Sequence, residues 1–451
     1  MRSGPTEQTR TDSPVETMMS WAVAFRLRQY AKSSLWIVPL LGLVLGVLLA
    51  EGALAAEEAD WRPGGWQYSA TTASSVLSAI VGAMVSLLGF VVTIGVLVVQ
   101  QATSSLSPRY MRLWYRDRLQ KAVLASFTGT FAFAFSLLRT IESDSVPDMG
   151  VTLAGLAVAA CLLLLLIYLN RFTHNLRPVA IAELVGRMGA QVLLGAADRI
   201  RSSAPREGAA TAVPAGGPVT YIRSEHGGAV QAFDAAGLEA TARRHDCVFV
   251  VTRPVGDFVP PGAVLIEVHG GVPVPDPRKV TGLVALGAER TIEQDPAFAL
   301  RILVDIAVRA LSPAVNDPTS AVQVLNHIDA FLHTVGGLDI GGGRHVLADD
   351  DGRPRLVVPG RTWEDYLQLA VTEIREYGAG SLQICRRLRA LLQDLLDALP
   401  ADRLPPVHAE LGLLDEAVER EFRDPDRRAA ARTADPQGIG GGRRPRTAPS
   451  G

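Results

Sequence analysis

The feature that most constrains this chain is a long apolar stretch, residues 74–100, which contains no charged residue and no proline. At ~1.5 Å per residue it predicts a helix of roughly 40 Å, longer than the ~30 Å hydrocarbon core of a bilayer. We therefore expect this helix to cross a membrane and to extend slightly beyond it. The polar turn QATSSLSP and the basic aromatic segment RYMRLWYRDR follow.

A stripe of small and polar residues runs along this predicted helix. With the exception of Leu97, steps of 3.6 residues meet only small or polar side chains: Ser75, Ser78, Gly82, Ser86, Gly89, Thr93, Gln100, Ser104 and Ser107. Small residues at this spacing let helices pack closely, and Ser or Thr can hydrogen-bond across such a contact. Alternatively, the stripe from Ser75 to Ser104 lines a water-filled path through an oligomer, where uncharged polar groups are tolerated.

Three further apolar stretches, about 35–50, 122–138 and 151–169, complete a predicted four-helix transmembrane domain over residues 34–172. Arginine and lysine precede the first stretch and follow the second and fourth, whereas the intervening loops near Glu51 and Asp148 are acidic. The positive-inside rule therefore predicts a multi-pass protein of the bacterial inner membrane with both termini in the cytoplasm. The segment GALAA after the first stretch resembles a signal-peptidase site, but the further spans favour an uncleaved anchor.

The turn after the striped helix predicts an elbow at the inner membrane interface. Ser107 and Pro108 have the order of an N-cap and a first helical residue. Arg109, Arg112 and Trp114 then mix charge and aromatic surface, as in amphipathic interfacial helices. The elbow either serves only as an anchor or transmits movement of the cytoplasmic part to the striped helix.

The rest of the chain predicts an α+β cytoplasmic domain between polar ends, so the fold class is a four-helix transmembrane section followed by α+β structure. We expect the barrel-like β-rich lobe to precede the helical lobe, which contains a hairpin around Asp351-Gly352. The predicted segments are a disordered N-terminus (1–33), a stalk helix (173–201), a linker (202–218), a β-rich lobe (219–289), a helical lobe (290–423) and a disordered tail (424–451).

One cytoplasmic motif, RALSPAVNDPTSA, brings several oxygen-bearing side chains close in sequence. Asp305, Asn316 and Asp317 could gather oxygens around a cation. The alternative is a helix–turn–helix in which Asn316 or Asp317 caps the second helix and Asp305 forms ion pairs with arginines one turn away. No metal site is assigned on these residues.

Three segments carry a resemblance to a known family: SLLGFVVTIGVLVVQQATSSLSPRYM, GDFVPPG and RALSPAVNDPTSA. Together they resemble bacterial predicted membrane proteins of domain of unknown function 2254, over roughly Leu35 to Phe422. The resemblance implies the same membrane section and cytoplasmic domain, and no activity. GDFVPPG also resembles the first hairpin of biotinyl and lipoyl carrier domains, but Lys279 lacks the flanking pattern, so no cofactor is expected.

The sequence contains no Gly-rich phosphate loop, no nucleophile elbow and no HExxH helix, so we do not expect an enzyme. A formal net charge of −2 argues against nucleic-acid binding. The first hypothesis is a homo-oligomeric ion channel or channel-like protein, lined by the striped helix and gated by the cytoplasmic domain. The second is a membrane-anchored sensor or scaffold without conduction. The expected partners are the lipid bilayer, further copies of the chain, and ions or a small cytoplasmic ligand.

Overall fold

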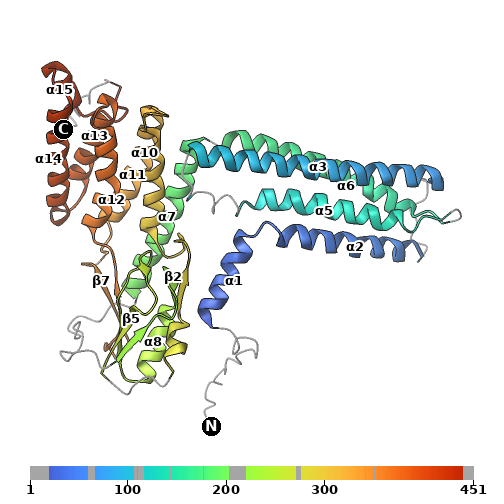
Figure 1. Cartoon of the computed structure of the whole chain (residues 1–451), viewed down its shortest axis with the longest axis horizontal. Helices are drawn as coiled ribbons and strands as arrows, with labels where there is room; N and C mark the ends of the chain where they lie inside the picture. Colours follow the sequence, from blue (N-terminus) through green and yellow to red (C-terminus); the bar gives the residue numbers. More distant parts are fainter. Residues whose placement is uncertain are drawn as a thin grey trace, which may run out of the picture. The chain divides into compact units, whose positions relative to one another are not determined.

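The computed structural model divides the chain into two compact units, residues 30–181 and residues 182–451, with the segment before Tyr30 joining the second unit. Figure 1 labels most of the helices and some of the strands, coloured in sequence order. The residues that the structure describes are 20–58, 67–105, 109, 116–142, 145–175, 177–202, 220–270, 276–340, 342–349 and 351–439.

Four long helices make up the first unit, and α5 lies at its centre. They are α2 (Ile37–Glu58), α3 (Ala70–Ser105), α5 (Arg118–Leu138) and α6 (Asp148–Asn175). Of the apolar window in α5, 56% is buried, against 17–28% in the other three, because α5 packs against all of them. The core is formed by residues such as Leu77, Met84, Phe127 and Leu137. The membrane section expected from the sequence is therefore present.

The contact between α2 and α5 is a backbone contact at glycine. A Cβ placed on Gly42 or Gly46 would collide with the carbonyl oxygen of Ala125 or Gly129, respectively. The Thr128 hydroxyl donates to the Pro39 carbonyl across the same contact, at 2.9 Å. Small residues four apart permit this close approach of membrane helices.

Among the described residues, five helices, rather than the four expected, are long and apolar enough to cross a membrane. The fifth is α7 (Pro178–Ser202), which the sequence predicts as a stalk helix. From Ala182 onward α7 belongs to the second unit. There Gly189 lies against Ala299 and Phe331, so close that a Cβ on it would be 2.9 Å from the Phe331 ring. The apolar face of α7 therefore packs on protein.

The strands of the second unit form two small sheets and not one barrel. One has the order β1-β5-β3-β8-β7, and the other β4-β2-β6. Every pairing is antiparallel except β3 with β8, where Phe249 lies opposite Leu356. The strands are β1 (Thr220–Arg223), β2 (Gly228–Phe233), β3 (Val248–Val251), β4 (Phe258–Val259), β5 (Val264–His269), β6 (Val284–Gly287), β7 (Arg344–Ala348) and β8 (Pro354–Pro359).

The hairpin expected around Asp351-Gly352 is present as β7 and β8. The predicted boundary between a β-rich lobe and a helical lobe is wrong, however, because this hairpin completes the five-stranded sheet. Leu356 and Val358 of β8 are buried in the same apolar cluster as Phe249 and Leu265. Burial of this strand requires the earlier strands as neighbours, which explains why the lobes do not separate.

Helices complete the second unit. Asp295, Asp317 and the Thr362–Asp365 capping box begin α10 (Pro296–Ala310), α11 (Pro318–Gly336) and α12 (Trp363–Gly378). Ion pairs join these helices to α13 (Leu382–Ala398) and α14 (Leu404–Glu421), including buried Arg375 with Glu410, and Arg387 with Asp329 at 2.7 Å. The remaining helices are α8 (Ala235–Arg244), α9 (Pro277–Thr281) and the short 3-10 helix Ala401–Arg403.

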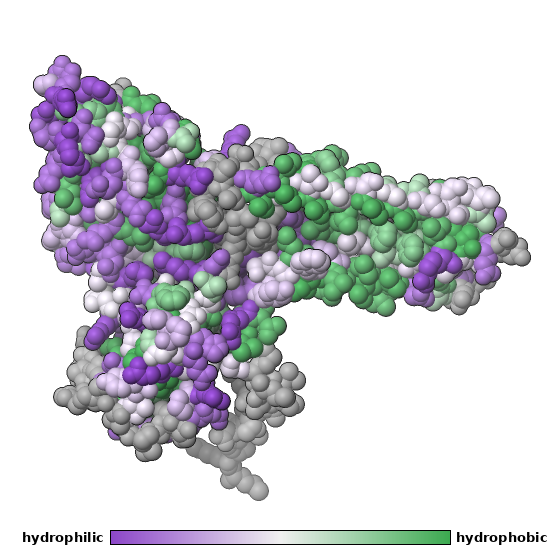
Figure 2. Space-filling model, viewed as in Figure 1, coloured by the Kyte–Doolittle hydropathy of each residue, from purple (hydrophilic) through white to green (hydrophobic). Residues whose placement is uncertain are grey.

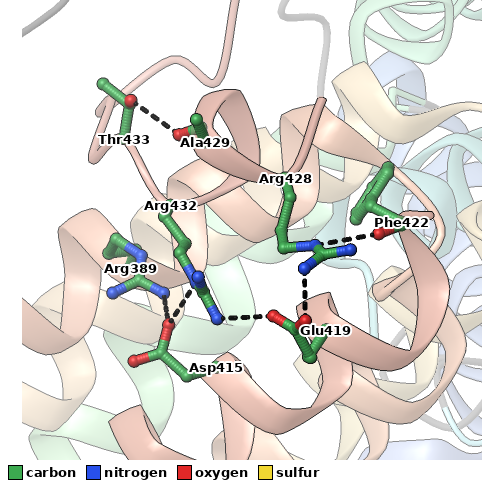
Figure 3. A network of polar contacts seen from close by, with 8 residues as sticks. All are labelled: Arg389, Asp415, Glu419, Phe422, Arg428, Ala429, Arg432 and Thr433. Carbon is green, nitrogen blue, oxygen red and sulfur yellow. Dashed lines mark hydrogen bonds and ion pairs between the residues drawn. The ribbon is translucent and has the colours of Figure 1, made fainter. Parts of the chain in front are cut away.

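Parts of both ends expected to be disordered are helical. α1 (Trp21–Ser33) forms within the predicted N-terminal segment, and the Ala22 N–H donates to the Gly282 carbonyl at 2.8 Å. α15 (Pro425–Ala431) forms within the predicted tail, where Arg428 and Arg432 both pair with Glu419 (Figure 3). Gly282 is distant from Ala22 in sequence, and Glu419 lies on the preceding helix α14, so the composition of each end alone did not predict these contacts. Apart from Ser202, the predicted linker lies outside the described residues.

Candidate functional site

The stripe on α3 faces away from the other helices of its own unit. The α3 residues that pack inward include Ala73, Leu77, Ile80, Met84 and Val91. At 100° per residue, their mean direction lies about 180° from that of the stripe. All stripe residues from Ser75 to Gln100 named above are exposed. Figure 2 shows a pale row among the apolar residues of this unit, along its upper edge.

Two hydroxyls of the stripe are satisfied within α3 itself. The Ser86 hydroxyl donates to the Gly82 carbonyl at 3.0 Å, and the Thr93 hydroxyl donates to the Gly89 carbonyl at 2.9 Å. A Cβ on Gly82 or Gly89 would meet nothing within 4 Å. The stripe is therefore not a packing contact with another described helix of the same chain. Ser104 lies on α3, but its side chain is not among those described.

The predicted elbow is described at one residue only. Arg109 is exposed, whereas Ser107, Pro108, Arg112 and Trp114 lie outside the described residues. Lys121, near the start of α5, is a further polar residue that was not among the predicted site residues. Only 8% of Lys121 is exposed, and its ammonium donates to the Lys32 carbonyl at 2.6 Å. Its signal in the sequence is a lone lysine at the start of an apolar span.

The cytoplasmic motif is a capped turn. Asp317 accepts from the Ser320 N–H at 3.0 Å and begins α11. Asn316 adopts the left-handed conformation, with φ of 49°. Asp305 pairs instead with Arg301 at 2.8 Å, one turn away on α10. These contacts are those of a helix cap and an ion pair between Asp305 and Arg301. No cluster of three acidic, histidine or cysteine side chains suited to a metal occurs in the described part of the chain.

A cavity of about 450 Å³, which the sequence did not reveal, lies within the second unit. We call it the Tyr366 cavity. Apolar side chains from α1, α7, β2, β8 and α10 and from the segment before β7 form most of its wall, including Trp21, Leu193, Phe233, Pro296, Ile340 and Val358. Pockets of this size, mostly apolar with a few polar groups, are typical of small-molecule sites. Its residues are scattered from position 21 to position 366, so no local motif marks it.

Three polar side chains line one part of this cavity: His345, Arg361 and Tyr366. His345 lies against Gly360, the residue before Arg361. Burial lowers the pKa of His345, and Asp339 only partly opposes this, so the imidazole is neutral at pH 7. Burial raises the pKa of Tyr366, and the nearby Arg361 charge opposes that rise. The cavity therefore contains a phenol, a neutral imidazole and a guanidinium near one another.

The acidic groups on the wall are already engaged. Asp295 is 2% exposed, pairs with Arg290 at 2.7 Å, and accepts from the Phe298 N–H at 3.1 Å. Burial raises the pKa of Asp295, and the Arg290 charge opposes that rise. Asp234 accepts from the Gly237 N–H at 3.1 Å. Asp295 and Asp234 thus serve mainly to cap α10 and α8.

Comparison with known proteins agrees with the membrane section. Residues 32–394 match the family described as "Predicted membrane protein (DUF2254)". Uncharacterized proteins of Mycobacterium bovis and of Mycobacterium tuberculosis strain H37Rv are each 30% identical to the chain over 430 residues, which covers 89% of this chain and 79% of the relative. No solved structure matches the chain. The chain therefore belongs to this family of predicted membrane proteins, and it contains several helices able to span a bilayer.

Proposed function

We propose that this protein is a homo-oligomeric channel of the bacterial inner membrane, in which α3 of each copy faces a central path. The observation that carries the proposal is the uncharged stripe from Ser75 to Gln100, which lies on the side of α3 opposite its packed face. A surface of glycine and serine offers little dispersion contact to lipid, but it suits a neighbouring helix or water. Contact with other copies is therefore the better use of this face.

The chemistry of the stripe favours conduction over coupled transport. The apolar part of α3, from Ser74 to Gln100, contains no ionisable residue. Coupled transporters place ionisable groups within the membrane, where protons and ions bind. Serine, threonine and glutamine side chains can line a hydrated path without such groups.

The topology in this proposal has four crossings. The segment before Tyr30 and the residues from Ala182 onward form one compact unit, joined by the hydrogen bond between Ala22 and Gly282. A unit that lies on one side of a membrane requires an even number of crossings between its two parts. Helices α2, α3, α5 and α6 provide four, and α7 is then not a crossing. We place this unit and both termini in the cytoplasm, because the basic segments lie on that side.

The conduction proposal is tested by single-channel recording of the purified protein in planar bilayers. We expect discrete currents that are reduced or abolished by Ser86→Leu and by Thr93→Leu, since each adds bulk to the stripe. Val92→Leu is the matched control, because Val92 is exposed on α3 but lies beside the stripe. Equal currents from all four proteins would contradict a path along the stripe.

A second candidate is a membrane-anchored sensor without conduction, and the Tyr366 cavity favours it, since a ligand site needs no pore. In that case the stripe is a dry contact between copies. Single cysteines at Ser86 would then form disulfide-linked dimers in membranes, while the wild-type protein gives no current at any voltage. Neither candidate assigns a catalytic activity to the chain.

A further inference from the structure

The Tyr366 cavity offers hydrogen-bond donors that the described protein does not use. Only 5% of the Tyr366 surface is exposed, yet its hydroxyl contacts no hydrogen-bond partner within the described residues. The imidazole of His345, on β7, likewise has no hydrogen-bond partner among the described residues. The only ion pair that Arg361 forms with the described residues is a 3.5 Å contact to Asp257, a residue that is itself 37% exposed. A tyrosine hydroxyl on a residue as buried as Tyr366 normally has a partner, so this hydroxyl, with the partly buried His345 and Arg361 on the same wall, points to a ligand.

The ligand that matches these donors carries oxygen acceptors. A guanidinium supplies several N–H donors in one plane, and a phenol and a neutral imidazole each supply one more. Charge-assisted hydrogen bonds from Arg to a carboxylate are among the strongest in proteins. Of the acidic side chains on the wall, Asp295 is neutralised by its ion pair with Arg290, at 2.7 Å. A single negative charge can therefore be accepted beside Arg361.

The rest of the cavity wall indicates what the uncharged part of the ligand is like. Trp21, Leu193, Phe233 and Val358 present aromatic and aliphatic surface. The side-chain amide of Gln294, which also lines the cavity, is already engaged: its oxygen accepts from the Phe233 N–H at 3.1 Å, and its nitrogen donates to the Phe233 carbonyl at 3.2 Å. A cavity of about 450 Å³ accepts one small molecule. We propose that the Tyr366 cavity binds a small monocarboxylate with an apolar body, its carboxylate held by Arg361, Tyr366 and His345.

The proposal is tested on the full chain in lipid nanodiscs with a decanoic acid that carries a diazirine. After irradiation, labelled peptides are mapped by mass spectrometry. We expect labelling of peptides from α7, β8 and α12, and we expect decanoate to displace this labelling. Decanol should need at least about a tenfold higher concentration for the same displacement, since it cannot form the charged hydrogen bond. Labelling of α2 and α6, which contact lipid, provides an internal reference.

Two pairs of variants locate the site. Ala196→Phe fills the cavity from α7, whereas Leu194→Phe adds bulk at an exposed position of the same helix. Arg361→Gln removes the proposed carboxylate partner, whereas Arg344→Gln removes an exposed charge on β7. We expect the first variant of each pair to reduce decanoate-displaceable labelling at least about tenfold, and the second to leave it unchanged.

Labelling confined to the membrane helices would overturn the proposal. So would equal displacement by decanol and decanoate, or equal labelling within each pair of variants. Thermal unfolding of each variant shows whether a loss of labelling reflects loss of the fold. If Arg361→Gln does not fold, Arg361→Lys, which keeps the charge, is measured in its place. Retained labelling in Arg361→Lys supports the site, and lost labelling contradicts it. Because no step depends on conduction, these outcomes are independent of the channel proposal.

Discussion

At the scale of single residues, glycine determines how closely α2 and α5 approach each other. Gly42 and Gly46 of α2 lie one turn apart, and their hydrogens face the backbone of α5 at Ala125 and Gly129. The spacing was visible in the sequence as small residues four apart. The partner was not, because nothing local indicates that this face meets α5 rather than lipid.

Replacement of Gly46 by leucine tests this contact. The new side chain would collide with the Gly129 carbonyl, and overpacking of this kind costs about 1–3 kcal/mol. We expect a lower thermal unfolding temperature in detergent for Gly46→Leu. Gly52→Leu is the matched control on α2, because a Cβ there meets nothing within 4 Å. Equal unfolding temperatures for the two variants would show that α2 and α5 are not in backbone contact.

At the scale of elements, helices that pack locally were predictable and their partners were not. The apolar periodicity of α10 and α11, the caps at Asp295 and Asp317, and the hairpin at Asp351-Gly352 all follow from short-range patterns. The parallel pairing of β3 with β8 joins Phe249 to Leu356, across more than one hundred residues. The Tyr366 cavity depends on that pairing, since Val358 of β8 lines it, and so the cavity could not be inferred beforehand.

The helix α15 illustrates an element held by charge. Glu419 of α14 pairs with Arg428 and Arg432, and Asp415 lies 3.3 Å from Arg432 (Figure 3). Glu419 is 52% exposed, and exposed pairs contribute about 0.2–1 kcal/mol each. We expect Glu419→Gln to speed amide hydrogen exchange in residues 425–431 without a measurable change in global unfolding.

Glu421→Gln is the control for this experiment, because Glu421 makes only a 3.7 Å contact with its neighbour Arg420. Unchanged exchange in Glu419→Gln would mean that apolar contacts, such as those of buried Ala431, hold α15 in place. High salt should reproduce the effect of the substitution, since it screens exposed charges.

At the scale of the whole molecule, the native thiols leave a clean background for mapping topology. Cys161, Cys247 and Cys385 are all buried. Burial raises the pKa of Cys247 and of Cys385 to about 11, so at pH 7 neither is present as the reactive thiolate. A membrane-impermeant maleimide should therefore label only cysteines that are introduced at exposed positions.

Three such positions are Arg28, Ser145 and Glu225, each exposed. In intact cells we expect labelling of Ser145→Cys alone, and labelling of Arg28→Cys and Glu225→Cys only after permeabilisation. This pattern follows from an even number of crossings between α1 and β1. Labelling of Arg28→Cys and Glu225→Cys from opposite sides would make the number odd and α7 a crossing.

The contact of Ser20–Gln29 with the second unit also governs the order in which the protein can be completed. Trp21 leaves the ribosome early, but the rest of its cavity, from Leu193 to Tyr366, is synthesised only after every helix of the membrane unit. The N-terminal helix must therefore wait, without its final neighbours, throughout membrane insertion. Assembly of the second unit is a late event that joins the first and last parts of the nascent chain, and a fragment that begins at α7 would lack one wall of the cavity.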